Sequence, residues 1–230
     1  MNAYPTRTIA YICELFHAPL PIATDSVQRI HNRYFEEGSP PYSSFAVTPA
    51  GPVLSNPGLR PGVISQVVFL PDRIQFREEL GAMTAEDFGA RVHKIADDSA
   101  QERSLEGYAG QRITIRTLVN PRKFDQSIDY MRDGLLGFGD MIDVFEATPQ
   151  IYGLRMEFPA GPESRTTNSL RIENYFQDKR TLYMENQSAS GPVRVMDQLS
   201  QLEENVASAY DFLVQKASSF VQAFDLRLEE

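Results

Sequence analysis

The chain has 230 residues, of which 42% are hydrophobic and 23% are charged, and its formal net charge is −9. A chain of this length can bury roughly 70–75% of its unfolded surface, so it needs no disulfide or structural metal to form a core. Its single cysteine, Cys13, excludes an internal disulfide framework and a cysteine-based zinc cluster. The acidic balance argues against binding to nucleic acid or anionic lipid, because such binding needs clustered Lys and Arg.

No part of the sequence approaches the ~18 consecutive apolar residues that a membrane-spanning helix requires. Residues 1–5 lack the basic region and apolar stretch of a secretion signal. Cys13 falls within an apolar run, where we expect a buried thiol. These features predict a cytoplasmic protein that does not associate with a membrane.

The first half of the chain begins with a strand pattern at residues 7–16, which are rich in β-branched and aromatic side chains. A helix then begins at Thr24 or Asp25, and its expected buried positions are Val27, Ile30, Tyr34 and Phe35. Four strand segments follow, at residues 45–48, 52–55, 63–70 and 73–79. A second helix begins after Thr84 with an acidic first turn, which favours its N-terminus.

The second half runs through a similar order. Residues 111–120 predict a strand. Residues 122–136 predict a helix, with Phe124, Ile128, Met131 and Leu135 as its inward positions. Three further strands are expected at residues 151–158, 169–175 and 181–186. A long helix is expected over about residues 194–226. Its apolar stripe is Val206, Tyr210, Leu213, Ala217, Phe220 and Phe224, which predicts a helix packed on the core, with an intermolecular coiled coil as the alternative.

The repeated order predicts an α+β fold, in which pseudo-duplicated β-α-β-β-β-α units form a largely antiparallel sheet packed by helices. We expect two lobes, residues 1–105 and 106–230, within one compact unit, because the segment that joins them is short. In element order this pattern resembles the duplicated saddle of TATA-binding-protein-like folds, which implies one continuous curved sheet backed by helices. DNA binding does not follow, because a minor-groove binder needs a basic concave face.

Several short segments of the second half resemble an uncharacterised prokaryotic family of sporadic distribution and about this length. They are Gly153-Leu154-Arg155, Leu170-Arg171-Ile172-Glu173, Asp178 to Arg180, Glu185-Asn186-Gln187, Tyr210-Asp211-Phe212-Leu213 and Phe224-Asp225. The resemblance covers roughly residues 110–226. That family has no assigned activity, so the resemblance implies a real domain and no particular chemistry.

The strands of the second half also predict one polar surface. Alternation sends Leu154, Met156, Phe158, Leu170, Ile172, Leu182 and Met184 to the core. The opposite face then carries Arg155, Glu157, Arg171, Glu173, Tyr175, Tyr183 and Glu185, with Arg112 and Arg116 adjoining. This pattern is typical of a solvated face with cross-strand ion pairs. It also fits a surface for a protein partner or a cradle for a carboxylate or phosphate.

Motifs for other chemistry are missing from the sequence. The histidines, His17, His31 and His93, have no ligand spacing, so we expect no metal and no cofactor. No nucleophile motif is present. The glycine-rich residues 134–139 close a predicted helix instead of opening one, which excludes a phosphate-binding loop.

The sequence therefore predicts a non-enzymatic cytoplasmic interaction or assembly protein. It would bind a protein partner, or a second copy of itself as a homodimer, through the polar sheet face or the C-terminal helix. The alternative is a ligand-binding protein or an enzyme that acts on an anionic ligand in the Arg/Glu/Tyr cradle. Nucleic-acid binding ranks last of the three hypotheses.

Overall fold

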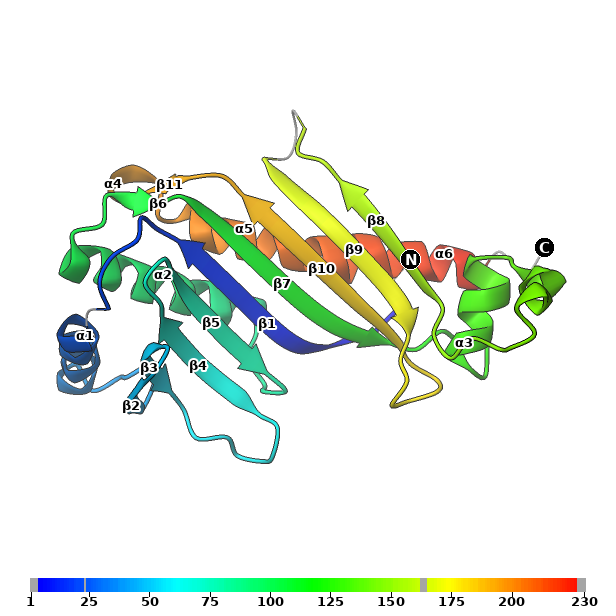
Figure 1. The fold of residues 1–230 in the computed structure, drawn as a ribbon, viewed down its shortest axis with the longest axis horizontal. Helices are drawn as coiled ribbons and strands as arrows, with labels where there is room; N and C mark the ends of the chain where they lie inside the picture. The colour runs from blue at the N-terminus through cyan, green and yellow to red at the C-terminus, as the bar shows by residue number, and fades with distance from the viewer. Residues whose placement is uncertain (1–3, 23, 162–164, 227–230) are drawn as a thin grey trace.

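The computed structural model describes residues 4–22, 24–161 and 165–226. Within these residues, nine strands form one sheet in the order β2-β3-β4-β5-β1-β7-β10-β9-β8. Neighbouring strands are antiparallel throughout. Figure 1 shows the long helices on one side of this sheet and its other side facing the viewer without a helix over it. The α+β class expected from the sequence is thereby confirmed.

The elements follow the predicted order closely in the first half. They are β1 (Thr6–Phe16), α1 (Thr24–Glu36), β2 (Ser44–Thr48), β3 (Gly51–Ser55), β4 (Ile64–Phe69), β5 (Arg73–Glu79) and α2 (Ala85–Arg103). Thr84 caps α2, because its hydroxyl oxygen accepts the backbone N–H of Asp87. In α1, Val27, Ile30 and Tyr34 are buried as expected, but Phe35 is 49% exposed, so its predicted burial is wrong.

The second half contains more short elements than the sequence predicts. They are β6 (Gly107–Tyr108), β7 (Gly110–Val119), α3 (Ser127–Asp129), the π-helix η1 (Tyr130–Leu135), the 3₁₀-helix η2 (Gly139–Phe145), β8 (Gly153–Phe158), β9 (Thr166–Asn174), β10 (Leu182–Ser190), β11 (Val193–Arg194), α4 (Val195–Gln198), α5 (Gln201–Asp211), the π-helix η3 (Phe212–Ala217) and α6 (Ser218–Leu226). Strands β6 and β11 pair as a separate ribbon.

Strands β1 and β7 lie side by side at the centre of the sheet and are paired along most of their length. On each side of this pair comes the last long strand of the same half of the chain, β5 next to β1 and β10 next to β7. The two halves are therefore joined by backbone hydrogen bonds in one sheet. No separate interface between lobes is needed to hold them together.

Alternation along the central strands separates the two faces of the sheet. Cys13 and Ile113 are paired across β1 and β7, and both are buried on the side of the helices. Arg112 points to the opposite side, as the sequence predicts, and Thr114 lies on that side as well. The hydrophobic core thus lies between one face of the sheet and helices α1, α2, α5 and α6.

The predicted helix over residues 122–136 is the main error in element assignment. The structure has only one α-helical turn from Ser127, followed by π-helix η1. The segment before Ser127 is held in an irregular conformation because the carboxylate of Asp225 accepts the backbone N–H groups of Arg122 and Lys123. Asp225 of α6, distant in sequence, thereby satisfies two backbone donors of this segment.

The long C-terminal helix is confirmed, but π-helix η3 interrupts it and shifts its buried stripe. Val206, Leu213 and Ala217 are buried as predicted. The predicted Tyr210, Phe220 and Phe224 are only partly buried, although they pack against the core. Beyond η3 the buried positions are Ser218, Val221 and Asp225, and the last two each come one residue after the expected Phe220 and Phe224. A π turn inserts an extra residue into the helical repeat, which explains this shift of one position. Since the stripe packs on the sheet, it is not free for an intermolecular coiled coil.

Buried amide side chains fix α5 on the sheet. The Asn186 amide on β10 donates to the backbone oxygen of Ala209. Asn205 on α5 donates to the side-chain oxygen of Gln111 on β7, and the Gln111 amide donates to the backbone oxygen of Leu202. These bonds have specific geometry, so they define the position of the helix more narrowly than apolar packing alone.

We predict that Asp225→Ala lowers the free energy of unfolding by about 3 kcal/mol, because charged hydrogen bonds of this kind contribute strongly and their donors would be left unpaired. The Asp225 carboxylate is fully buried and also accepts the Tyr4 hydroxyl at 2.6 Å. Urea unfolding followed by circular dichroism measures the change. The control is Asp211→Ala, an exposed position in the same long helix, which should change stability by less than about 0.5 kcal/mol. Equal effects of the two substitutions would contradict this prediction.

A second buried carboxylate, Glu78 on β5, connects three elements on the helix side. One of its oxygens accepts hydrogen bonds from Arg91 of α2 at 2.8 Å, Ser65 of β4 at 3.0 Å and the Tyr42 hydroxyl at 3.0 Å. Burial raises the pKa of Glu78, although these partners oppose the shift. Since the folded protein binds this proton more tightly than the unfolded chain, the associated stability is present at low pH and is lost as the pH rises through the folded-state pKa.

Arg91→Met should therefore destabilise the protein more at about pH 8 than at about pH 5, because Glu78 can be neutralised only by taking up a proton. At the higher pH we expect a loss of about 3 kcal/mol, as for other buried ion pairs that lose one partner. Arg33→Met is the control, since its Asp98 pair is more exposed. Denaturant melts at both pH values test the prediction, which fails if the Arg91 variant loses the same stability at each.

Candidate functional site

The alternate residues Leu170, Ile172, Leu182 and Met184 are buried in the core beneath the helices. Alternation therefore places the predicted polar residues together on the other side of the sheet, which bears no helix in Figure 1. The register places Glu185 of β10 directly opposite Arg116 of β7 and Arg171 of β9. Tyr183 lies opposite Glu173, and Arg155 of β8 lies opposite Arg171. Tyr175 follows the end of β9 and stacks on Tyr183, with 6.4 Å between ring centroids. We call this surface the open face.

The best-ordered part of the open face is centred on Glu185. Its carboxylate accepts hydrogen bonds from the Arg116 guanidinium and from the Tyr183 hydroxyl, both at 2.7 Å. Burial and the bond to this carboxylate raise the pKa of Tyr183 well above its usual value, so the phenol keeps its proton. Burial by itself lowers the pKa of Arg116, but the bond to Glu185 and nearby acidic groups outweigh it, and the net shift is upward.

An aromatic–arginine cluster lies beside Glu185, formed by Arg171, Tyr175 and Tyr183. The Arg171 guanidinium lies 5.8 Å from the centre of the Tyr183 ring and also pairs with Glu173 at 2.6 Å. Next to this cluster, Phe176 is 72% exposed. Arginine and tyrosine side chains held in this way lose little conformational freedom when a partner binds, which is typical of interface anchors.

The remaining predicted residues form ion pairs nearer the margins. On β8, Arg155 pairs with Glu157 at 2.8 Å, and Ser169 also donates to the Glu157 carboxylate. These hydrogen bonds lower the pKa of Glu157. On β7, Arg112 pairs with Glu14 at 3.4 Å. The nine predicted residues are thus brought to one face, but every arginine among them has a carboxylate partner.

The first half of the chain extends the same face, which our sequence analysis did not include. Arg73, Arg77 and Glu79 of β5 and Glu14 of β1 share this side through the β1–β5 and β1–β7 registers. Glu14 also pairs with Arg73 at 3.3 Å. The sequence indicates that Glu14 lies on the polar face of β1, because its neighbours Cys13 and Leu15 are apolar and point to the other face. Only the pairing of β1 with β7 shows that the two polar faces are continuous.

Each arginine of the open face pairs with a neighbouring carboxylate. Among the described residues, no group of three or more His, Cys, Asp or Glu side chains is arranged to hold a metal ion. The histidines are separate: His17 bonds to the Ala18 carbonyl, His31 packs on Phe35 and Phe45, and His93 pairs with Glu203. Cys13 is fully buried, and burial raises its thiol pKa to about 12, which keeps it protonated.

Comparison with protein-family models and with curated proteins found no match to this chain. The resemblances to the TATA-binding-protein-like folds and to the uncharacterised prokaryotic family therefore stay predictions. In the part of the chain that the structure describes, no helix combines the length and apolar character needed to cross a membrane.

We predict that the ion pairs of the open face differ in strength with their exposure. A double-mutant cycle between Arg116 and Glu185, whose side chains are 35% and 14% exposed, should give a coupling of about 1–2 kcal/mol. The same cycle between Arg155 and Glu157, which are 71% and 62% exposed, should give no measurable coupling, because solvent screens this pair. Chemical unfolding of the seven proteins that the two cycles require, one parent, four single variants and two double variants, measures both. Equal couplings would mean that the centre of the face is no better ordered than its edge.

Proposed function

We propose that the protein is a non-enzymatic interaction protein whose open face binds a protein partner, and that this partner is a second copy of the chain. The observation that carries the proposal is a large sheet face without a helix over it, on which Arg and Tyr side chains are already held in place by ion pairs. Binding to such a face costs little side-chain entropy.

The charge of the open face favours a second copy. Basic and acidic side chains alternate on it, and arginines are slightly in excess, whereas the whole chain has a net charge of −9. Two copies repel one another through most of their surfaces and least through this face. An interface related by a twofold axis brings the same patch of both copies together, so arginines of one copy can meet glutamates of the other.

The ion pairs also weigh against the alternative of an anionic ligand. An incoming carboxylate or phosphate would have to displace Glu185 from Arg116 or Glu173 from Arg171. Both glutamate side chains are largely buried by their neighbours. A protein surface can instead add contacts around the pairs without breaking them.

Sedimentation velocity over a range of concentrations tests this proposal. We expect the parent protein to form dimers and Arg171→Glu to shift the equilibrium toward monomer by at least tenfold in Kd, about 1.4 kcal/mol, because like charges would then meet at the aromatic–arginine cluster. Arg194→Glu makes the same charge change on the separate β6–β11 ribbon and should leave the dimer intact. A parent protein that stays monomeric at high concentration would refute self-association. Equal effects of both variants would show that the dimer does not form through the open face.

A further inference from the structure

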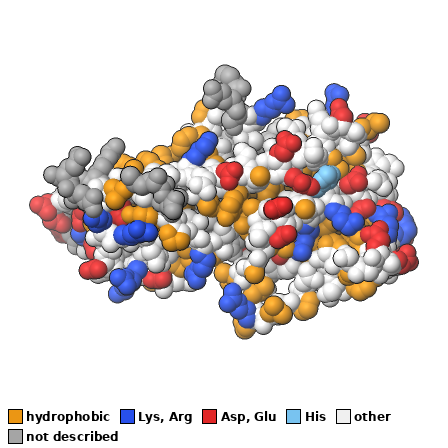
Figure 2. All heavy atoms as spheres, turned by 180° about the vertical axis from the view of Figure 1, so that it is seen from behind, with side chains coloured by type: hydrophobic (Ala, Val, Ile, Leu, Met, Phe, Trp, Pro, Cys, Tyr) orange, Lys and Arg blue, Asp and Glu red, His pale blue; other side chains and the backbone are white. Residues whose placement is uncertain are grey.

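The helix-bearing side of the molecule contains a cleft that is separate from the open face. It has a volume of 820 Å³ and lies where the N-terminus of α2 and the middle of α5 diverge above β1. Figure 2 shows this side, with acidic side chains gathered over its middle. A cleft of this volume is within the range that encloses small molecules in other proteins.

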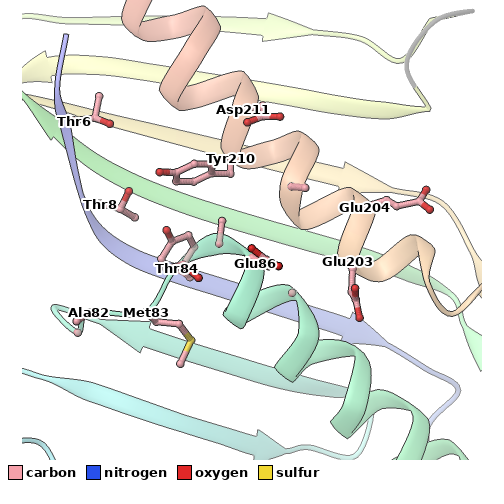
Figure 3. Close-up of a pocket in the computed structure, with 15 residues that line it drawn as sticks. Thr6, Thr8, Ala82, Met83, Thr84, Glu86, Glu203, Glu204, Tyr210 and Asp211 are labelled. Atoms are coloured by element: carbon pink, nitrogen blue, oxygen red, sulfur yellow. The ribbon is translucent and has the colours of Figure 1, made fainter. Parts of the chain in front are cut away.

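Two tyrosines line the cleft. Tyr210 extends from α5 toward Thr8 of β1 in Figure 3. The ring of Tyr11 lies 6.2 Å from that of Tyr210 and stacks on Phe88 at 5.3 Å, which fixes its position. Burial raises the pKa of Tyr11 to about 12, so its phenol is neutral at physiological pH. Neutral aromatic rings at this spacing present electron-rich faces, which attract cations.

Carboxylates supply the charge of the cleft. Glu86 of α2 and Glu203, Glu204 and Asp211 of α5 line it, and no Lys, Arg or His is among the described lining residues. Glu203 is already paired with His93. The other three carboxylates have no cationic partner within the cleft itself. An anionic ligand would meet only repulsion from these side chains.

The N-terminus of α2 does not reverse this preference. A helix N-terminus favours anions through its free N–H groups and its dipole. Here the Thr84 hydroxyl accepts the N–H of Asp87, and Glu86 and Asp87 occupy the first turn. The positive end of α2 is therefore compensated by residues of the helix itself.

We propose that this cleft binds a small organic cation, an ammonium group attached to an apolar or aromatic body. The ammonium group would lie among Glu86, Asp211 and the face of Tyr210, and the apolar body would lie against Tyr11 and Met83. Acidic residues alone would attract any cation. The tyrosine rings and the apolar lining beside them are what select an organic cation over a metal ion.

Isothermal titration with 2-phenylethylammonium tests the inference, with 3-phenylpropionate as the anion of similar size and Mg²⁺ at matched ionic strength as the simple cation. We expect binding of 2-phenylethylammonium that Tyr210→Leu and the double variant Glu86→Gln, Asp211→Asn each weaken about tenfold in Kd. These side chains are exposed or partly exposed, so their replacement should leave the fold intact. Glu157→Gln removes a carboxylate from the open face and should leave the affinity unchanged.

Three outcomes would overturn the inference. They are no binding of the amine, equal binding of the carboxylate ligand, and binding of the amine that the cleft variants do not weaken. Tight binding of Mg²⁺ that competes fully with the amine would also overturn it, since the acidic surface would then act as a general cation site. Self-association through the open face is measured without any amine, so the two proposals can fail independently.

Discussion

The antiparallel pairing of β1 with β7 is the contact on which the rest of the structure depends. It joins strands from the two halves of the chain by backbone hydrogen bonds and sets the register between them. Because side chains alternate with a period of two, this register decides which residues of both halves share a face. A shift of one residue would place Arg112 and Arg116 under the helices and expose Ile113 and Ile115.

The two faces of the sheet then acquire different chemistry. The helix side is closed by apolar packing and by buried hydrogen bonds between the sheet and α5. In these bonds, Asn186 of β10 and Gln111 of β7 donate to backbone oxygens of α5, and Asn205 of α5 donates to Gln111. The open side satisfies its polar groups with pairs such as Arg116–Glu185. A sheet face lined by such pairs is stable in water without further cover, and it can also accept a partner because its side chains are already ordered.

The cleft follows from how the helices cross the sheet. Helix α2 begins only at Ala85, whereas the C-terminal helix extends further along the sheet. The part of β1 near Thr6 and Thr8 therefore lies open between the two helices and lines the cleft. The sequence contains no sign of this gap, because Tyr11, Glu86 and Tyr210 are far apart in the chain. Their meeting is a result of helix direction and length, which local patterns do not encode.

The sequence by itself determined the class of fold, most strand and helix positions, and the side on which Arg155, Arg171, Tyr183 and Glu185 lie, because these depend on local periodicity. The tertiary structure alone decided three features. It placed the two polar faces side by side through the β1–β7 pairing, it replaced the predicted helix before Ser127 with an irregular segment bound to Asp225, and it inserted the π turn that moved burial from Phe224 to Asp225. Each of these depends on contacts between residues distant in sequence, and a pattern of neighbours along the chain carries no information about them.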